Sequence, residues 1–182
     1  MKINTFDNII HTTRYQCIYG ELTLASFNGC LCMCDWKSGK RHEYNMATLK
    51  KLLHADTYEC TDSVISAAIT ELDEYVQGER QSFDIPLHIT GTEFQQRVRY
   101  ELTNIPYGST ISYSELADRI GIPQGFRSVA SAVASNPLSI FIPCHRVIGA
   151  DGSLKGYAGG LYNKQALLNL ELAHSLLTVR LI

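Results

Sequence analysis

The sequence lacks several features that mark whole classes of protein. No apolar run is long enough to span a bilayer, and no apolar stretch near Met1 resembles a signal peptide. No Cys-x-x-Cys pair, internal repeat or low-complexity segment occurs. Only 19% of the residues are charged, while 45% are hydrophobic, which is typical of a folded domain rather than a disordered chain. We therefore expect a cytoplasmic protein that does not associate with membranes.

Cysteine is present, but its pattern does not indicate disulfides. Without a secretion signal, the six cysteines are expected to be reduced. Cys30, Cys32 and Cys34 alternate with a period of two, which favours one face of a strand. A zinc site there would need histidines close by, and His42 is the only near candidate. We predict no metal and no cofactor.

The net charge of −2 conceals a difference between the two halves of the 182-residue chain. Residues 1–88 contain 8 Lys and Arg against 12 Asp and Glu, whereas residues 89–182 contain 8 against 6. A mildly basic C-terminal half is compatible with a DNA partner but does not demand one.

The N-terminal half has the pattern of a small α/β domain. Short alternating segments separated by Gly20 and by the hairpin signal Asn28-Gly29 predict three strands, at Tyr15–Tyr19, Glu21–Ala25 and Leu31–Cys34. Apolar residues at spacings of three and four predict helices, at Met46–His54 and Thr61–Gln77. The extended segment 82–90, which contains Pro86, divides the chain into domains 1–88 and 89–182.

The C-terminal half is predicted to be mainly helical. Four helices are expected, over residues 92–103, 112–120, 124–135 and 161–172. Ser112 and Glu115 form a capping box for the second of these, and Gly121 lies in the short turn before the third. Two short helices joined by a tight turn with glycine indicate a helix-turn-helix.

The second helix of this pair has two different faces. One is predicted to face the core, with Phe126, Val129, Ala130 and Val133. The opposite face has small residues around one arginine, namely Arg127, Ser131, Ala134 and Ser135. Arg127 lies in the first turn, where recognition helices contact DNA. The pattern fits an ordinary helix pair with a solvated Arg127 equally well.

The segment Ile142-Pro143-Cys144-His145-Arg146-Val147 is the strongest candidate for chemistry. Pro143 restrains the backbone before Cys144, and His145 offers an imidazole beside a thiol whose reactive form is the thiolate. Taken alone, the segment also fits the end of a buried strand.

These residues, with others at a specific order and spacing, resemble the O6-alkylguanine-DNA alkyltransferases, also called methylated-DNA–protein-cysteine methyltransferases. The resemblance is close from about Gly91 to Ala173 and looser before it. Besides the cysteine segment, it rests on Phe94-Gln95-Gln96-x-Val98, Ile111-Ser112-Tyr113, Arg127, Asn136-Pro137, Gly156-Tyr157-x-Gly159-Gly160 and Glu171.

The resemblance implies an α+β fold and a repair reaction. The N-terminal domain would have ribonuclease-H-like strands with helices, and the C-terminal domain a winged helix-turn-helix. A monomer of the bacterial stand-alone type would bind double-stranded DNA through the minor groove and flip O6-alkylguanine out of the stack. It would then transfer the alkyl group irreversibly to Cys144, in a single turnover. Whether O4-alkylthymine is accepted stays open.

The resemblance also implies roles for the catalytic residues. Cys144 would be the alkyl acceptor and Tyr113 the donor to the departing base. Neighbours in an extended chain point to opposite faces, which makes direct contact between His145 and Cys144 awkward. The resemblance implies that a water bridges the two side chains. Glu171 would orient His145, although the pattern allows it to pair structurally with an arginine instead.

The resemblance further implies which residues would contact DNA or the flipped base. Arg127 would fill the space left in the stack, and Ser128, Ser131 and Ser135 would face DNA together with Tyr113. Asn136, Pro143, Tyr157, Ala158 and Gly159 would form the substrate pocket, with Asn136 connecting the recognition helix to the turn at Cys144.

Three other functions remain open. A non-catalytic binder of alkylated DNA would need no reactive cysteine. A cysteine hydrolase would turn over repeatedly and take its histidine from elsewhere in the chain. A helix-turn-helix regulator would be a dimer that recognises a specific site.

Overall fold

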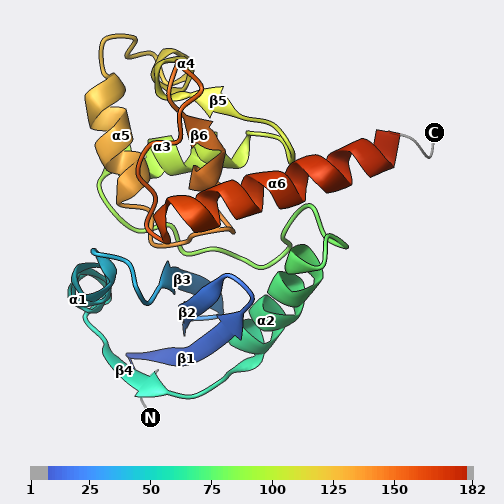
Figure 1. Ribbon diagram of the computed structural model, residues 1–182. Coiled ribbons are helices and arrows are strands. Elements are labelled where there is room, and N and C mark those ends of the chain that lie inside the picture. The colour runs from blue at the N-terminus through green and yellow to red at the C-terminus, as the bar shows by residue number, and fades with distance from the viewer. Residues whose placement is uncertain (1–7, 180–182) are drawn as a thin grey trace, which may run out of the picture.

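The computed structural model describes residues 8–179 (Figure 1). The first half contains β1 (Ile9–Cys17), β2 (Gly20–Phe27), β3 (Cys30–Trp36), α1 (His42–Leu53), β4 (Asp56–Glu59) and α2 (Ser63–Val76). The second half contains α3 (Glu93–Thr103), β5 (Ile111–Ser112), α4 (Tyr113–Arg119), α5 (Phe126–Ala134), the 3₁₀ turn η1 (Cys144–Arg146), β6 (Val147–Ile148) and α6 (Gly160–Val179). The predicted α+β class is confirmed.

The N-terminal sheet has the strand order β3-β2-β1-β4. Strands β1, β2 and β3 are antiparallel neighbours, and β4 pairs with β1 in parallel. The second and third predicted strands lie within β2 and β3, but the first overlaps β1 only at residues 15–17, since β1 begins and ends earlier than expected. Strand β4 was not predicted. All four residues of β4 are exposed, so the strand has no apolar alternation by which the sequence reveals it.

The cysteines of β3 do not share one face, because a β-bulge interrupts the register. Ala25 pairs with Met33 and Ser26 with Leu31, which leaves Cys32 without a partner across the strand. Cys32 consequently packs in the smaller core beneath α1, whereas Cys34 packs in the main core with α2. The prediction of one cysteine face was therefore wrong.

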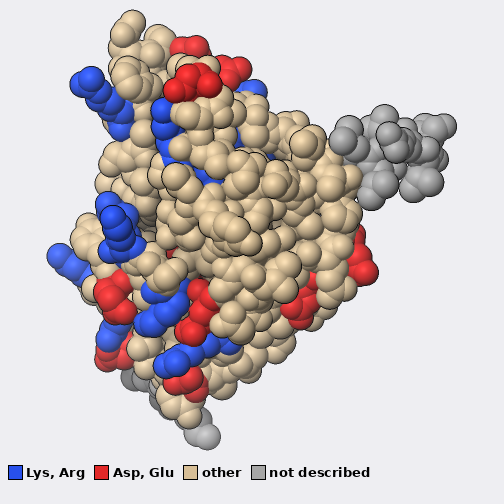
Figure 2. Space-filling model, in the orientation of Figure 1, with Lys and Arg blue, Asp and Glu red and all other residues tan. Residues whose placement is uncertain are grey.

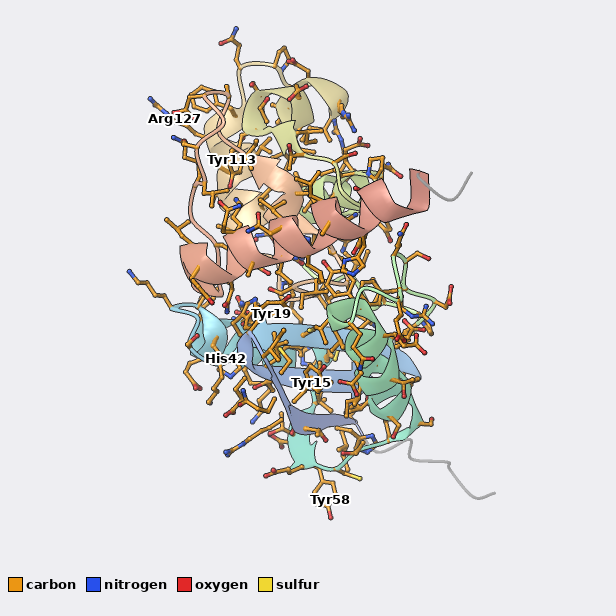
Figure 3. All side chains as sticks on the ribbon, turned by 45° about the vertical axis from the view of Figure 1, so that its right-hand side comes forward. Tyr15, Tyr19, His42, Tyr58, Tyr113 and Arg127 are labelled. Carbon is orange, nitrogen blue, oxygen red and sulfur yellow. The ribbon has the colours of Figure 1, made fainter. Side chains whose placement is uncertain are left out.

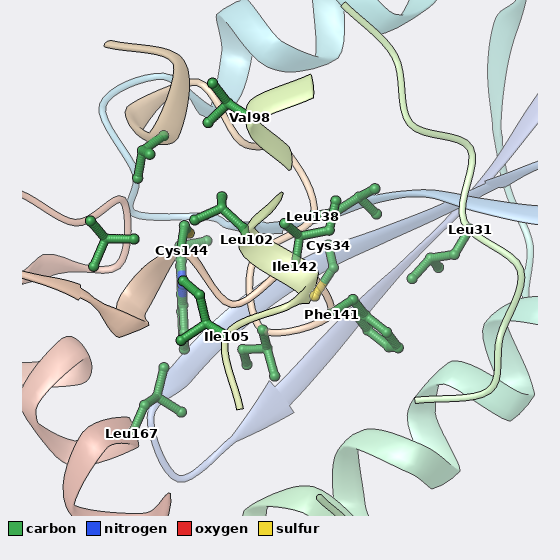
Figure 4. Close-up of a cluster of buried hydrophobic side chains, with 14 of the residues drawn as sticks. Leu31, Cys34, Val98, Leu102, Ile105, Leu138, Phe141, Ile142, Cys144 and Leu167 are labelled. Atoms are coloured by element: carbon green, nitrogen blue, oxygen red, sulfur yellow. The ribbon is translucent and has the colours of Figure 1, made fainter. Parts of the chain in front are cut away.

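The main core joins the two halves of the molecule. The segment around Pro86 hydrogen-bonds to the backbone of Leu31 in β3. The segment after α5 hydrogen-bonds to both backbone groups of Cys34: the Cys34 amide donates to the Pro137 carbonyl, and the Ser139 amide donates to the Cys34 carbonyl. Helix α6 crosses the molecule between the sheet and the helical half (Figure 1). Figure 4 shows that Cys144 lies in the same apolar cluster as Cys34, Leu138 and Ile142. The position of Cys144 therefore depends on both halves.

The helices of the C-terminal half begin where the sequence predicts. Thr92 and Ser112 cap α3 and α4, each with a complete capping box. Helices α4 and α5 pack against each other as a helix-turn-helix, and β5 and β6 form a short parallel sheet beside them. Helix α1 begins at His42, four residues before its predicted start.

The linker between the halves has no helix or named strand from residue 77 to residue 92, which agrees with the predicted extended crossing. The division into domains at residue 88 stays a prediction. None of the helices within residues 8–179 is long and apolar enough to cross a lipid bilayer.

Candidate active site

Cys144 lies in a turn, not at the end of a strand. The Cys144 amide donates to the Ile142 carbonyl over 2.7 Å, around Pro143 with φ −78° and ψ 59°. These angles define an inverse γ-turn, which suits the fixed φ of proline. The buried Ile140, four residues before Cys144, is the centre of a second turn, in which the Phe141 amide donates to the Ser139 carbonyl over 3.0 Å. Its φ of 74° is unusual for a β-branched side chain and is a sign of backbone strain. The two turns aim Cys144 at the end of α5.

Cys144 is 5% exposed, and its thiol accepts from one side-chain donor among the described residues. The Asn136 Nδ2 donates to Cys144 Sγ over 3.2 Å and to the Ile142 carbonyl over 3.0 Å. Burial raises the pKa of the Cys144 thiol, while the Asn136 amide and the Lys164 ammonium lower it. Asn136 thus connects the end of α5 to the turn and favours the thiolate.

His145 is completely buried beside Glu171. The His145 Nε2 lies 2.8 Å from Glu171 Oε1, and His145 Nδ1 has no protein hydrogen-bond partner within the described residues. Burial lowers the pKa of His145, against the Glu171 carboxylate that raises it. Because Nε2 faces a carboxylate oxygen, it carries the proton of the neutral ring, and Nδ1 is the basic nitrogen.

Glu171 also pairs with an arginine, so both interpretations of this residue hold. Arg146 Nε donates to Glu171 Oε2 over 2.9 Å, Arg146 Nη2 donates to Oε1 over 2.9 Å, and the Gly108 amide donates to Oε2 over 3.1 Å. His145 and Arg146 together lower the pKa of Glu171 to about 2, against its burial. The carboxylate is therefore ionised at neutral pH.

Lys164 is a buried cation that the sequence analysis missed. Its Nζ donates to the Val147 carbonyl over 2.6 Å and to the Lys155 carbonyl over 3.4 Å. Burial lowers the pKa of Lys164 to about 8. The signal for Lys164 was its spacing from Glu171: seven residues are two helical turns, which places both on one face of α6, with Leu167 between them.

A groove of ≈ 680 Å³ runs past α5, the Gly156–Gly160 loop and the turn before α1. Tyr113 and Arg127 both line it, on the same side of the helical half (Figure 3). Figure 2 shows Lys and Arg side chains along the side that carries α5 and α1. The basic residues that line the groove are Lys40, Arg41, Arg127 and Lys155. Three of them were not predicted, because they are brought together from separate segments.

The predicted faces of α5 need two corrections. Phe126 was expected in the core, but it is 48% exposed and lines the groove. The Arg127 guanidinium carbon lies over the Phe126 ring, 5.6 Å from its centre. Ala130 lines the groove as well. Ser135 was expected to face DNA, but it is buried against Arg99, which donates to the Ser135 carbonyl, and the Ser135 hydroxyl donates to the Ala132 carbonyl.

Ser128 and Ser131, the other predicted DNA-facing serines, are exposed on α5 but do not line the groove. The Ser128 hydroxyl donates to the Gly125 carbonyl over 2.7 Å, at the beginning of the helix.

The Gly156–Gly160 loop separates the groove from Cys144. Tyr157 and Ala158 line the groove on one side and a cavity of ≈ 10 Å³ on the other, whose wall includes Asn136 and Cys144. This cavity has room for about one water molecule. Trp36 Nε1 donates to the Tyr157 hydroxyl over 3.1 Å, which holds the loop against the N-terminal half. A purine therefore reaches Cys144 only if this loop moves.

The structure also describes the surroundings of two further predicted residues, Tyr113 and Gly159. Burial raises the pKa of Tyr113 to about 12, so its hydroxyl stays protonated at neutral pH. Gly159 packs so closely on Trp36 that a Cβ there would lie 2.7 Å from the indole ring. The described residues contain no group of three or more His, Cys, Asp or Glu that would hold a metal ion.

Two family models together match nearly the whole described chain. The ribonuclease-like domain of 6-O-methylguanine DNA methyltransferase matches residues 10–89, and the DNA binding domain of the same family matches residues 93–173. A methylated-DNA–protein-cysteine methyltransferase of Methanosarcina acetivorans is 43% identical over 135 residues, covering 74% of this chain and 86% of the relative. This chain belongs to the methylated-DNA–protein-cysteine methyltransferases.

Other members of this methyltransferase family agree in sequence and fold. The Mycobacterium tuberculosis relative is 53% identical over 106 residues, which are 58% of this chain and 64% of the relative's length. The crystal structure of M. tuberculosis OGT in complex with DNA superposes with a TM-score of 0.75 and 38% identity, over 91% of this chain and 94% of that one. A structure of M. tuberculosis O6-methylguanine methyltransferase gives a TM-score of 0.77 at 39% identity.

Proposed function

We propose that this protein repairs O6-alkylguanine in double-stranded DNA by transferring the alkyl group to Cys144, once per molecule. The observation that carries the proposal is the arrangement around Cys144: a buried thiol bonded by Asn136, beside the His145–Glu171 pair, beneath a basic groove that contains Tyr113 and Arg127. The DNA complex of the M. tuberculosis relative supports DNA as the partner.

DNA binds along the groove through its phosphates, which the four lining cations attract. The protein acts as a monomer in the cytoplasm. The small residues of α5 let this helix enter the minor groove of the duplex. Extrusion of the damaged base costs a few kcal/mol. Arg127, exposed at the start of α5 beside the apolar Phe126, compensates for part of this cost by occupying the vacated space.

The chemistry is an in-line displacement at the alkyl carbon. His145 Nδ1 takes the thiol proton through a bridging water, and Glu171 stabilises the imidazolium that forms. Cys144 Sγ forms a bond to the alkyl carbon while the bond from that carbon to O6 breaks, and the bonding electrons stay on the guanine. The Tyr113 hydroxyl donates to the departing base. Overall, the thiol proton replaces the alkyl group on guanine.

The thioether formed on Cys144 is not hydrolysed back to the thiol. Each protein molecule therefore reacts once and is consumed. The test is mass spectrometry of peptides after mixing the protein with an O6-methylguanine duplex. The Cys144 peptide gains one methyl group, with one equivalent transferred per protein. Cys144→Ala binds the duplex but gains no mass, and the matched variant of an exposed cysteine, Cys60→Ala, transfers normally.

The same experiment separates the alternatives. An unmodified Cys144 peptide under conditions of tight binding would favour a non-catalytic binder. Repeated turnover would favour a cysteine hydrolase, and binding that depends on one DNA sequence rather than on the lesion would favour a regulator.

A further inference from the structure

Tyr75 is the one side chain of the N-terminal half that hydrogen-bonds to the His145–Glu171 pair among the described residues. It lies in α2, is fully buried, and is separated from Glu171 by 96 residues in sequence. Its hydroxyl donates to Glu171 Oε1 over 2.7 Å and lies 3.4 Å from His145 Nε2. A residue of the N-terminal half thus reaches the His145–Glu171 pair.

The geometry decides which acceptor receives the Tyr75 proton. Glu171 Oε1 is closer than His145 Nε2 and belongs to an ionised carboxylate, which is the stronger acceptor. Burial and the Glu171 charge raise the pKa of Tyr75 well above its usual value, so the hydroxyl remains a donor. His145 Nε2–H and Tyr75 O–H therefore donate to the same oxygen.

We propose that Tyr75 is a positioning residue of the alkyl-acceptor site: its hydroxyl holds Glu171 Oε1 so that His145 keeps its proton on Nε2 and presents Nδ1 as the base. The Tyr75 hydroxyl and His145 Nε2–H donate to Oε1 beside Arg146 Nη2, and these donors together restrict the carboxylate to a single orientation. They also divide its negative charge, so that His145 is held in place without becoming protonated at neutral pH.

Loss of the hydroxyl has a defined sign. Without Tyr75, more of the Glu171 charge acts on His145, which favours the imidazolium and raises the pKa of His145. A larger fraction of the ring is then protonated at neutral pH and does not accept the thiol proton. The charged and titratable groups around His145 are Glu171 and Lys164 of α6, Arg146 and Cys144 of η1, Tyr75 of α2 and Tyr157 of the loop.

The chain offers a matched control in Tyr15 of β1, whose acceptor lies in the same helix as Tyr75. Tyr15 is a second buried tyrosine bonded to a carboxylate, and its hydroxyl donates to Asp73 Oδ1 over 2.6 Å. Tyr15→Phe removes the same kind of hydrogen bond as Tyr75→Phe. It reports the loss of stability without a change at His145.

The experiment measures alkylation of Cys144 against pH with two reagents, iodoacetamide and an O6-methylguanine duplex. Tyr75→Phe is expected to slow both reactions roughly tenfold at neutral pH, the value of one charge-assisted hydrogen bond in the transition state. Its pH–rate profile is expected to shift to higher pH. Tyr15→Phe is expected to keep the wild-type profile, even where its melting temperature falls.

The inference rests on the proposed alkyl transfer only for the duplex reaction. Failure of the duplex reaction in the wild type, with a shifted iodoacetamide profile in Tyr75→Phe, would reject the proposed function and keep the role of Tyr75. A Tyr75→Phe profile that superimposes on the wild type in both reactions would overturn that role, as would an equal shift in Tyr15→Phe.

A measurement on the wild type avoids any dependence on folding of the variant. Nitrogen NMR of the His145 ring distinguishes a proton on Nε2 from one on Nδ1. The expected tautomer is Nε2–H. A proton on Nδ1 would mean that Tyr75 donates to His145 rather than to Glu171, and would overturn the proposal.

Discussion

Trp36, the only tryptophan of the chain, donates its indole N–H to the hydroxyl of Tyr157 over 3.1 Å. This bond joins the end of β3 to the loop that covers Cys144, and the two rings meet edge to face with centroids 6.3 Å apart. Since the cavity at Cys144 holds about one water molecule, the contact between Trp36 and the loop opposes entry of a base.

Gly159→Ala should displace the loop, because its Cβ would lie 2.7 Å from the rigid Trp36 ring. Overpacking of this kind costs about 1–3 kcal/mol of stability. Trp36 fluorescence should shift to longer wavelength as the ring becomes exposed. Gly156→Ala is the control in the same loop, since its Cβ would meet nothing within 4 Å. Identical spectra for the two variants would show that the close packing at Gly159 is unimportant.

Asn136→Ala should make Cys144 less reactive near neutral pH. The substitution removes the amide that lowers the pKa of the Cys144 thiol, so the pKa rises and less thiolate is present at a given pH. The iodoacetamide rate at Cys144 should therefore begin to increase at a higher pH than in the wild type. Asn163→Ala removes another buried amide, bonded to the Tyr19 carbonyl, and should leave this pH dependence unchanged.

Glu171→Gln should reduce stability most at neutral pH. Its folded-state pKa is about 2, below the ordinary value of 4.5, so the ionised carboxylate stabilises the fold fully above about pH 4.5 and loses this effect as the pH falls towards 2. Removing the charge of Glu171 breaks its buried ion pair with Arg146, and loss of one partner of such a pair costs about 3–5 kcal/mol of stability.

Urea unfolding at several pH values measures this effect. The difference between wild type and Glu171→Gln should shrink as the pH falls from neutral towards 2. Glu101→Gln, which breaks the surface pair with Arg119, should change stability by about 0–1 kcal/mol. A constant difference across the whole pH range would contradict the depressed pKa of Glu171.

Arg127→Ala should slow repair of a methylated duplex more than the reaction with free O6-benzylguanine. Only the duplex reaction includes extrusion of a base, and the loss of a group that fills the stack should cost roughly tenfold in rate. Arg119→Ala is the control, because Arg119 is exposed but lies outside the groove. Equal slowing with both substrates would argue against a role of Arg127 in base extrusion.

Local patterns were sufficient for most elements. The capping box at Ser112 and the apolar spacing in α2 and α3 predict helices, because these signals act within a few residues. The patterns failed where context decides. Strand β4 is exposed and has no alternation, and a bulge at Cys32 reverses a face that the sequence presents as uniform.

Some residues of the site were predicted correctly and others were not, again because local patterns do not show which neighbours a residue has. The family resemblance indicated Cys144, His145 and Glu171, and the structure places the latter two 2.8 Å apart. It brings Phe126 into the groove and buries Ser135, since the neighbours of α5, not its periodicity, decide which side is covered.

By itself, the sequence determined the family, the helix pair and the nucleophilic segment, because these are recorded in residue types at short or specific spacing. Only the tertiary structure decided the direction of the Cys144 turn, the double role of Glu171 and the arrival of Tyr75 and Lys164 at the site. Hydrogen bonds between residues as far apart as Tyr75 and Glu171 depend on how the two halves of the chain pack together, and no local pattern contains that information.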